Sequence, residues 1–393
     1  MFLLCDKGFS LMRSLRSLVC CALLVALFTG AAGAAAKPSG TPVMIGAILS
    51  ISGPYAPLGE PERNAIQIAV ADVNASGGIN GHPLQVQILD DESKADTAQQ
   101  LATQLVGQKV AAIIGGSISP TSEAIARVAN DAKVLHVYMT PTLSIWQTKA
   151  GIRKYTFEAT PHNELEVTKL FTFMKNTLHT TKLAVLHDDQ LYGTQGTLVA
   201  EAEAKTQNVP IVDEEAYAVA ATDVTPQLQK AKASGADTIL IYTAAPSAGI
   251  LVRQVHQFGL KAHLIGTTGI VSDNFLKVTG KDGDGVYADM DLDRTYPNAL
   301  QKKLLAAYRA AYNAGANNFA SFAWDAVHLT AYALRTAKST DADKLAQTLE
   351  TMKPYTGTTG TYRFTATDHN GFNAGDIRIV IDHNGVWETL PKQ

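Results

Sequence analysis

The residues best suited to binding a small molecule form a short hydroxyl-rich segment, Ser117-Ile118-Ser119-Pro120. It follows an apolar run that ends in Gly115-Gly116, and Pro120 is typical of the first turn of a helix. Amides at a helix start lack an intrahelical acceptor and carry positive dipole potential, so this segment favours an anion. The alternative is that Ser117 and Ser119 only cap the helix.

The other polar clusters show no catalytic or metal-binding pattern. Asp90-Asp91 and Asp188-Asp189 would point in opposite directions on an extended chain, unlike an acid–base couple. The acids at 282–293 lack the glycine and the bidentate glutamate that a calcium loop requires. The ten histidines show no metal-ligand spacing. The sequence therefore predicts no catalytic residue, no cofactor and no metal ion.

The composition limits the classes of partner. The 393 residues include 33 Lys and Arg against 36 Asp and Glu. This balance lacks the clustered positive charge that nucleic acid requires, so we expect no nucleic-acid partner. The length predicts roughly two or three domains.

Residues 1–36 have the pattern of a secretory signal peptide. Arg13 and Arg16 precede an apolar run at 18–28, and small residues ending in three alanines at 34–36 follow. The run is shorter than the ~20 apolar residues of a membrane span. All three cysteines lie within 1–36, so we expect an exported, periplasmic protein whose mature form has none.

Short apolar runs alternate with amphipathic stretches, which predicts two series of βαβ units with a break near 158–160. The expected strands are 43–49, 84–89, 110–114, 134–139, 182–187, 211–219, 238–242 and 263–265. The expected helices between them are 60–74, 95–106, 120–132, 160–178, 192–207, 225–233 and 247–258. Three further helices at 298–314, 319–338 and 343–352 precede a hairpin at 377–390 with an Asn-Gly turn.

This alternation predicts an α/β protein in which parallel sheets are covered by helices on both faces. Open sheets of this kind bind ligands at the carboxyl ends of their strands. The loops to search are therefore those that follow Leu49, Gly115, Met139, His187, Tyr242 and Gly266.

Specific motifs lie at these loops. The most distinctive are S-G-P-Y-A at 52–56 and D-V-N-A-S-G-G-I-N-G at 72–81. Ile114-Gly115-Gly116-Ser117, Thr140-Pro141, His187-Asp188 with Tyr192-Gly193, and the stretch 253–260 follow in order. This series, over essentially the whole mature chain, resembles the leucine/isoleucine/valine-binding protein family, which are type I periplasmic solute-binding proteins of ABC importers.

The resemblance implies two lobes, each a mostly parallel sheet flanked by helices, joined by three crossover strands near 159, 287 and 375. The N-terminal lobe would comprise 41–158 plus 288–374. The C-terminal lobe would comprise 159–287 plus 375–393.

The resemblance also implies that two loops of the first lobe hold a ligand carboxylate with amides and hydroxyls. The loops correspond to Ser117-Ile118-Ser119-Pro120 and Thr142-Leu143-Ser144. We therefore expect Ser119 and Ser144 to lie close together at the rim of the gap, facing into it. The full expected binding set is Ser117, Ser119, Thr142, Ser144, Tyr55, Tyr192 and Thr268. The alternative for Tyr192 is a ring that only covers the helix start.

The second lobe departs from the amino-acid-binding pattern. Family members that bind α-amino acids place a Glu after the strand matching 264–266, where this chain has Thr267-Thr268-Gly269. A family aromatic is replaced within 243–245, and a family Tyr by Leu58. A buried ammonium without a carboxylate is costly. The predicted ligand is therefore a carboxylate-bearing solute, either branched-chain amino acid-like or an aromatic or aliphatic acid. Three acids could still face an ammonium: Asp188, Asp189 and Asp289.

The leading hypothesis is a monomeric binding protein that closes its lobes over the solute and delivers it to ABC permease subunits. A second hypothesis is a sensor that presents its closed form to a receptor. A third is a secreted α/β enzyme, which would need a nucleophile–base pair or a metal site that the sequence does not show.

Overall fold

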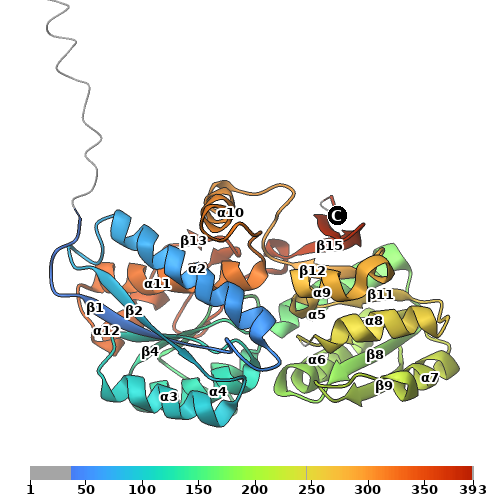
Figure 1. Cartoon of the computed structure of the whole chain (residues 1–393). Coiled ribbons are helices and arrows are strands. Elements are labelled where there is room, and N and C mark those ends of the chain that lie inside the picture. Colours follow the sequence, from blue (N-terminus) through green and yellow to red (C-terminus); the bar gives the residue numbers. More distant parts are fainter. Residues whose placement is uncertain (1–36, 245, 392–393) are drawn as a thin grey trace, which may run out of the picture. The chain divides into compact units, whose positions relative to one another are not determined.

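The structure, a computed structural model, describes residues 37–244 and 246–391 (Figure 1). The expected signal peptide at 1–36 lies outside these residues. The chain from Pro38 onward forms one compact unit that contains two large sheets.

The first sheet is wholly parallel, with the strand order β2-β1-β3-β4-β7. Its strands are β1 Val43–Leu49, β2 Leu84–Asp90, β3 Ala112–Gly115, β4 Leu135–Tyr138 and β7 Thr156–Glu158. The helices packed on it are α2 Ala56–Ala75, α3 Ala95–Gly107, α4 Ser119–Asp131, α11 Asn318–Ala337 and α12 Ala342–Glu350, with α10 Ala299–Tyr312 against α2.

The unbroken apolar character of β1 follows from burial on both faces. Ile45 and Leu49 belong to a core cluster shared with α2 and α11, whereas Ile48 belongs to a cluster with α3 and α4. Figure 1 shows these two helix pairs on opposite faces of the sheet. A strand enclosed in this way has no polar face to alternate with.

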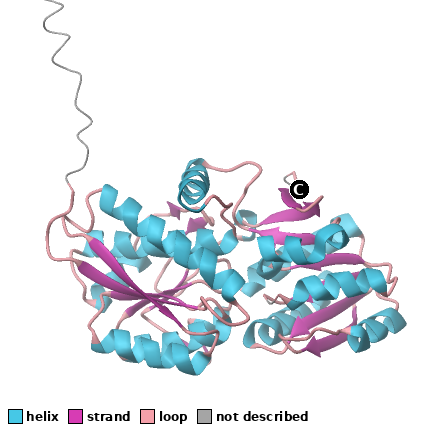
Figure 2. Cartoon of the chain, in the orientation of Figure 1, coloured by secondary structure: helices cyan, strands magenta, loops and turns pink. Residues whose placement is uncertain are grey.

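The second sheet has the order β16-β15-β12-β11-β10-β8-β9. Its strands are β8 Leu183–Asp188, β9 Ile211–Tyr217, β10 Thr238–Tyr242, β11 His263–Gly266, β12 Tyr287–Met290, β15 Arg378–His383 and β16 Val386–Thr389. Its helices are α5 Asn163–Phe173, α6 Leu191–Gln207, α7 Thr225–Ser234, α8 Ser247–Gln257 and α9 Asp273–Thr279. Figure 2 shows its strands among covering helices.

Two antiparallel strands complete this sheet. β15 pairs with β12 and with β16, and Asn384 and Gly385 both have positive φ, at 53° and 78°. Two such residues form the type I′ turn that matches the twist of a hairpin. The expected hairpin is confirmed. Two small antiparallel pairs lie outside the main sheets: β5 Gln147–Thr148 with β6 Gly151–Ile152, and β13 Tyr355–Thr356 with β14 Thr361–Tyr362.

The expected α/β class with mostly parallel, helix-covered sheets is confirmed. The proposed lobe boundaries stay a prediction, and the one at 287/288 falls inside β12, which remains in the second sheet to Met290. Of the strands and helices of the two main sheets, β7, β12 and α9 were not expected from the sequence, since three, four and seven residues are too short to show a period.

Candidate functional site

A cavity lies where the carboxyl ends of strands from both sheets meet. From the side of the first sheet it is lined by Tyr55, Leu58, Ser117, Ile118, Ser119, Pro120, Met139, Thr140 and Pro141. From the side of the second sheet it is lined by Asp188, Gln190, Tyr192, Ala244, Thr268 and Gly269, and from α11 by Phe319 and Phe322. This is the position at which open α/β sheets bind ligands.

Two glycines turn the chain from β3 into α4 and so place residues 117–120, here called the anion loop, at the cavity. Gly115 and Gly116 have φ of 124° and 73°, which favours glycine. A Cβ on Gly115 would come within 2.1 Å of the Ile48 carbonyl oxygen. A Cβ on Gly116 would come within 2.1 Å of Ser122 Oγ. Both positions therefore require glycine.

The first-turn amides of α4 have no intrahelical acceptor and carry the positive end of the helix dipole. Ser117 and Ser119 line the cavity beside them and are 3% and 1% exposed. The capping alternative does not hold: the N-cap is Ile118, and no side chain caps this helix. The anion loop therefore offers amides and hydroxyls to an anionic group.

Thr142 contacts the anion loop through a side-chain hydrogen bond. Its Oγ1 lies 2.7 Å from Ser119 Oγ, and the Tyr138 hydroxyl donates to its carbonyl at 3.1 Å. Thr142 is buried but does not line the cavity. Ser144 is exposed on a 3-10 turn, Leu143–Ile145, and also lies outside the cavity lining. The structure thus brings Ser119 and Thr142 together, whereas Ser144 is exposed and lies outside the cavity lining.

The second rim of the cavity carries a buried carboxylate, Asp188, at the end of β8. Its Oδ2 accepts a hydrogen bond of 2.6 Å from Thr243 Oγ1, and its Oδ1 accepts one of 2.9 Å from the Gln190 amide. Burial raises the pKa of Asp188 above its ordinary value, although these hydrogen bonds act in the opposite direction. Gly193 makes room for it, because a Cβ there would meet Asp188 Oδ1 at 2.7 Å.

Tyr192 lines the cavity with its ring, while its hydroxyl turns inward. The hydroxyl donates to Glu166 Oε2 at 3.1 Å, and the ring packs on Tyr242 with centroids 4.8 Å apart. Its contribution to a ligand is therefore apolar contact. Tyr55, 5% exposed, also lines the cavity. Burial and the charges of Asp188 and Asp189 raise its pKa, so it remains a neutral phenol.

Thr268 joins the two sides of the cavity. Its Oγ1 accepts a hydrogen bond of 2.6 Å from Asn318 Nδ2 at the start of α11. Asn318 Oδ1 in turn accepts from the Leu292 amide at 3.1 Å. The side-chain oxygen of Thr268 is therefore already engaged by the protein.

An apolar wall completes the cavity. Leu58, Met139, Phe319 and Phe322 contribute the largest apolar side chains of this wall. From the sequence, Leu58 was only a departure from a family pattern, and the segment 319–338 was only one of three further helices. The position of Met139 at the end of a strand was the one signal that could have identified part of this wall.

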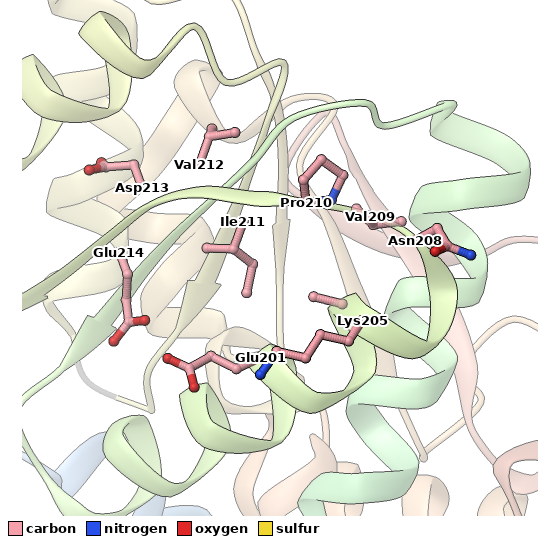
Figure 3. Close-up of a pocket in the computed structure, with 10 residues that line it drawn as sticks. Glu201, Lys205, Asn208, Val209, Pro210, Ile211, Val212, Asp213 and Glu214 are labelled. Carbon is pink, nitrogen blue, oxygen red and sulfur yellow. The ribbon is translucent and has the colours of Figure 1, made fainter.

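A second hollow lies far from this chemistry, between α6 and the edge strand β9 (Figure 3). It is a wide groove open to solvent, and Figure 3 shows Glu201 and Glu214 directed toward one another there. Partial burial and the nearby Glu201 raise the pKa of Glu214. The groove is larger than the cavity, but it does not enclose a solute and lies away from the carboxyl ends of the strands.

Within residues 37–244 and 246–391, no cluster of three or more His, Cys, Asp or Glu side chains is arranged to hold a metal ion. In the same part of the chain, no helix combines the length and the apolar character needed to cross a bilayer.

Comparisons with known proteins all indicate the same family. The model of the family described as periplasmic binding protein matches residues 42–380. A leucine-, isoleucine-, valine-, threonine- and alanine-binding protein of Pseudomonas aeruginosa is 24% identical over 317 residues, 79% of this chain and 83% of the relative. A Leu/Ile/Val-binding protein homolog of Brucella abortus is 27% identical over 335 residues, 84% of this chain and 89% of the relative.

A solved structure is similar over nearly the whole fold. The substrate-binding protein of a branched-chain amino acid transporter from Streptococcus pneumoniae, in complex with isoleucine, superposes with a TM-score of 0.80 at 26% identity. The match covers 89% of this chain and 99% of that structure. The relatives are named as binding proteins, not as enzymes.

Proposed function

The chain belongs to the periplasmic binding protein family, and we propose that it binds an α-amino acid with an apolar side chain and delivers it to an ABC importer. The observation that carries this proposal is that groups complementary to both charges of an amino acid line one cavity. The anion loop faces it from the first sheet, and Asp188 faces it from the second.

Each part of an amino acid has a matching surface. The α-carboxylate fits the free amides and hydroxyls of the anion loop. The α-ammonium fits Asp188, which takes the place of the Glu missing from 267–269. The side chain fits the wall formed by Leu58, Phe319 and Phe322.

An organic acid without an ammonium group suits the cavity less well. It would leave the Asp188 carboxylate buried opposite the anion loop with no cation, which is unfavourable. This distinction favours the amino acid over the aromatic or aliphatic acid that the second-lobe sequence left open. The names of the relatives, which refer to the binding of leucine, isoleucine and valine, support the same choice.

The remaining parts of the proposal follow from the family and from residues 1–36. A signal peptide there would export the chain to the periplasm. A monomeric binding protein whose halves close on the ligand would present its closed form to the permease subunits. A sensor would use the same closure, and the two roles differ in whether uptake of the solute is lost when the gene is deleted.

Thermal unfolding of the mature protein with leucine and its fragments tests the choice of ligand. A ligand at a hundredfold excess over its Kd stabilises by about 2.7 kcal/mol. We expect leucine to raise Tm by several degrees. Leucine without its ammonium (4-methylpentanoate), leucine without its carboxylate (3-methylbutylamine) and benzoate should each give much smaller shifts.

A larger shift with 4-methylpentanoate or benzoate than with leucine would contradict the amino acid proposal and restore the organic acid. Recovery of a chemically altered leucine after incubation would instead favour the enzyme hypothesis.

A further inference from the structure

The hydroxyl of Ser117 has two hydrogen-bond partners inside the protein, one of which is a buried carboxyl group. The Ser50 amide donates to Ser117 Oγ at 3.0 Å. Glu62 Oε2, from α2, is also within hydrogen-bond distance of Ser117 Oγ. Glu62 is 0% exposed, and its other oxygen has no partner among the described residues. The carboxyl group of Glu62 thus depends on Ser117 for its hydrogen bonding.

The direction of the Glu62–Ser117 hydrogen bond decides what Ser117 offers the cavity. A hydroxyl has one hydrogen and two acceptor positions, and the Ser50 amide occupies one acceptor position. An ionised Glu62 would take the Ser117 hydrogen, and a lone pair would then face the ligand. A protonated Glu62 would donate to the second acceptor position, which leaves the Ser117 hydrogen free to point into the cavity.

We propose that Glu62 is a positioning residue that stays protonated and donates a hydrogen bond to Ser117 Oγ. The Ser117 hydroxyl is then free to donate a hydrogen bond to the ligand's carboxylate. This inference rests on the proposed function, because it needs an anionic group at the anion loop. It makes Glu62, which does not line the cavity, part of the selection for anions.

The surroundings of Glu62 favour the neutral carboxylic acid. Burial raises its pKa well above the ordinary value, although the hydrogen bond with Ser117 acts in the opposite direction. The negative charge of Asp91, whose Oδ1 accepts from Ser50 Oγ at 2.7 Å, raises the pKa of Glu62 further. The pKa of Asp91 is itself raised to about 6, mainly by burial.

The cations that contact α2 are used elsewhere. Lys303 of α10 and His328 of α11 both bind Asp72, and Arg335 of α11 donates to carbonyl oxygens near the end of α2. Arg63, next to Glu62 in sequence, donates to Asn64. Within the described part of the chain, no ion pair stabilises an ionised Glu62.

Infrared spectroscopy of carboxyl groups tests this inference directly. Spectra of the wild type minus Glu62→Gln, recorded near neutral pH, should show the C=O band of a protonated carboxylic acid. Glu60→Gln is the matched control, because Glu60 is exposed on the same helix and its loss should remove a carboxylate band. If Glu62→Gln also removes a carboxylate band, the inference is wrong.

The response of that band to ligand tests the link to Ser117. Donation from Ser117 to a bound carboxylate strengthens its acceptance from Glu62, so leucine should shift the Glu62 band. In Ser117→Ala the band should not respond to leucine. Glu62→Gln should keep leucine affinity within about threefold, because the Gln amide donates in the same way, whereas Ser117→Ala should weaken it about tenfold.

The outcomes separate this inference from the proposed function. A Glu62 band that does not move while leucine binds would overturn the inference. If the wild type binds no amino acid, the proposed function fails, and the band of the ligand-free protein still reports the protonation of Glu62.

Discussion

The two sheets repeat one topology but face the cavity with opposite chemistry. In each sheet the second strand of the series lies at an edge, next to the first, and the third and fourth follow on the other side: β2-β1-β3-β4 and β9-β8-β10-β11. Each therefore reverses its strand order beside its first strand, where a ligand site is expected. Topology fixes where the rims lie, and the residue types decide which charge each rim accepts.

The difference arises at two helix starts. Neither helix has a side-chain cap, but at α6 the Asp188 carboxylate accepts a hydrogen bond from the amide of the N-cap residue Gln190, so the protein's own carboxylate lies at the positive end of the helix. At α4, no side chain caps the helix and two glycines bring the chain in without bulk, so this end remains for a ligand. The same structural element thus binds an internal anion on one rim and is free to bind an external anion on the other.

Of the changes to the two rims, replacement of Asp188 should have the largest effect on ligand affinity. In Asp188→Asn the ligand ammonium would lose its charged partner, and such losses cost about 2–5 kcal/mol, or roughly 30-fold to several thousandfold in Kd. Calorimetric titration with leucine measures the change. Asp189→Asn is the control, because Asp189 is exposed, and it should change Kd by less than about threefold. Equal effects in the two variants would show that Asp188 is not the ammonium partner.

Removing the Ser119 hydroxyl tests the opposite rim. A hydrogen bond to a charged group contributes about 1.5–3 kcal/mol, so Ser119→Ala should weaken leucine binding by roughly 10- to 150-fold. Ser144→Ala should leave Kd unchanged, because Ser144 is exposed outside the cavity. If Ser144→Ala were the more damaging of the two, the expected second carboxylate loop would act in the ligand-bound form.

Adding a methyl group at Gly193 tests how Asp188 is positioned. The new Cβ would approach the Asp188 carbonyl oxygen at 2.3 Å and its carboxylate Oδ1 at 2.7 Å, so Asp188 must move. We expect Gly193→Ala to weaken leucine binding about tenfold, as overpacking of one to two kcal/mol implies. Gly107→Ala is the control, since its Cβ would meet nothing within 4 Å. Unchanged affinity in Gly193→Ala would mean that Asp188 tolerates displacement.

A lower pH should have the smallest effect on ligand affinity, and it should act only through Asp188 on the second rim. The ammonium needs an ionised Asp188, and burial raises the pKa of this group in the free protein. Affinity is therefore full above that pKa and falls as the pH drops through it, earlier than the ordinary aspartate value of about 3.9 would allow. We expect a weaker Kd at pH 5 than at pH 7.

Two variants test whether Asp188 causes the loss of affinity at low pH. Asp188→Asn should abolish it, whereas Asp91→Asn should retain it, although the pKa of Asp91 is raised to about 6. A decline that disappears in Asp91→Asn would assign the titration to the first sheet instead.

The predictable parts of the fold are those with a clear hydrophobic period. The limits of β1 and β10 match the sequence expectation residue for residue, because apolar runs bounded by polar or glycine-rich turns define buried strands. The break between the two series was predictable from the same alternation. β12 was not, because its four residues contain an acid whose burial depends on the fold around it.

The candidate site was predictable where it depends on local chain geometry. The anion loop follows from two glycines, a proline and a strand end, all visible in the sequence. Asp188 could be recognised only as one of three possible acids, since its approach to the cavity depends on how β8 pairs within its sheet. Phe319 and Phe322 enter from a helix distant in sequence, which no local pattern could indicate.

Helix α11 and the C-terminal hairpin lie near the end of the sequence, and this position has a consequence for folding. Helix α11 packs on α2 across sequence separations such as the 256 residues between Asp72 and His328, and β15 must arrive to pair with β12. Neither half of the molecule is complete until nearly the whole chain is available, and such high contact order slows folding. If residues 1–36 direct export, this delay keeps the nascent chain in the unfolded form that can be threaded through a membrane channel.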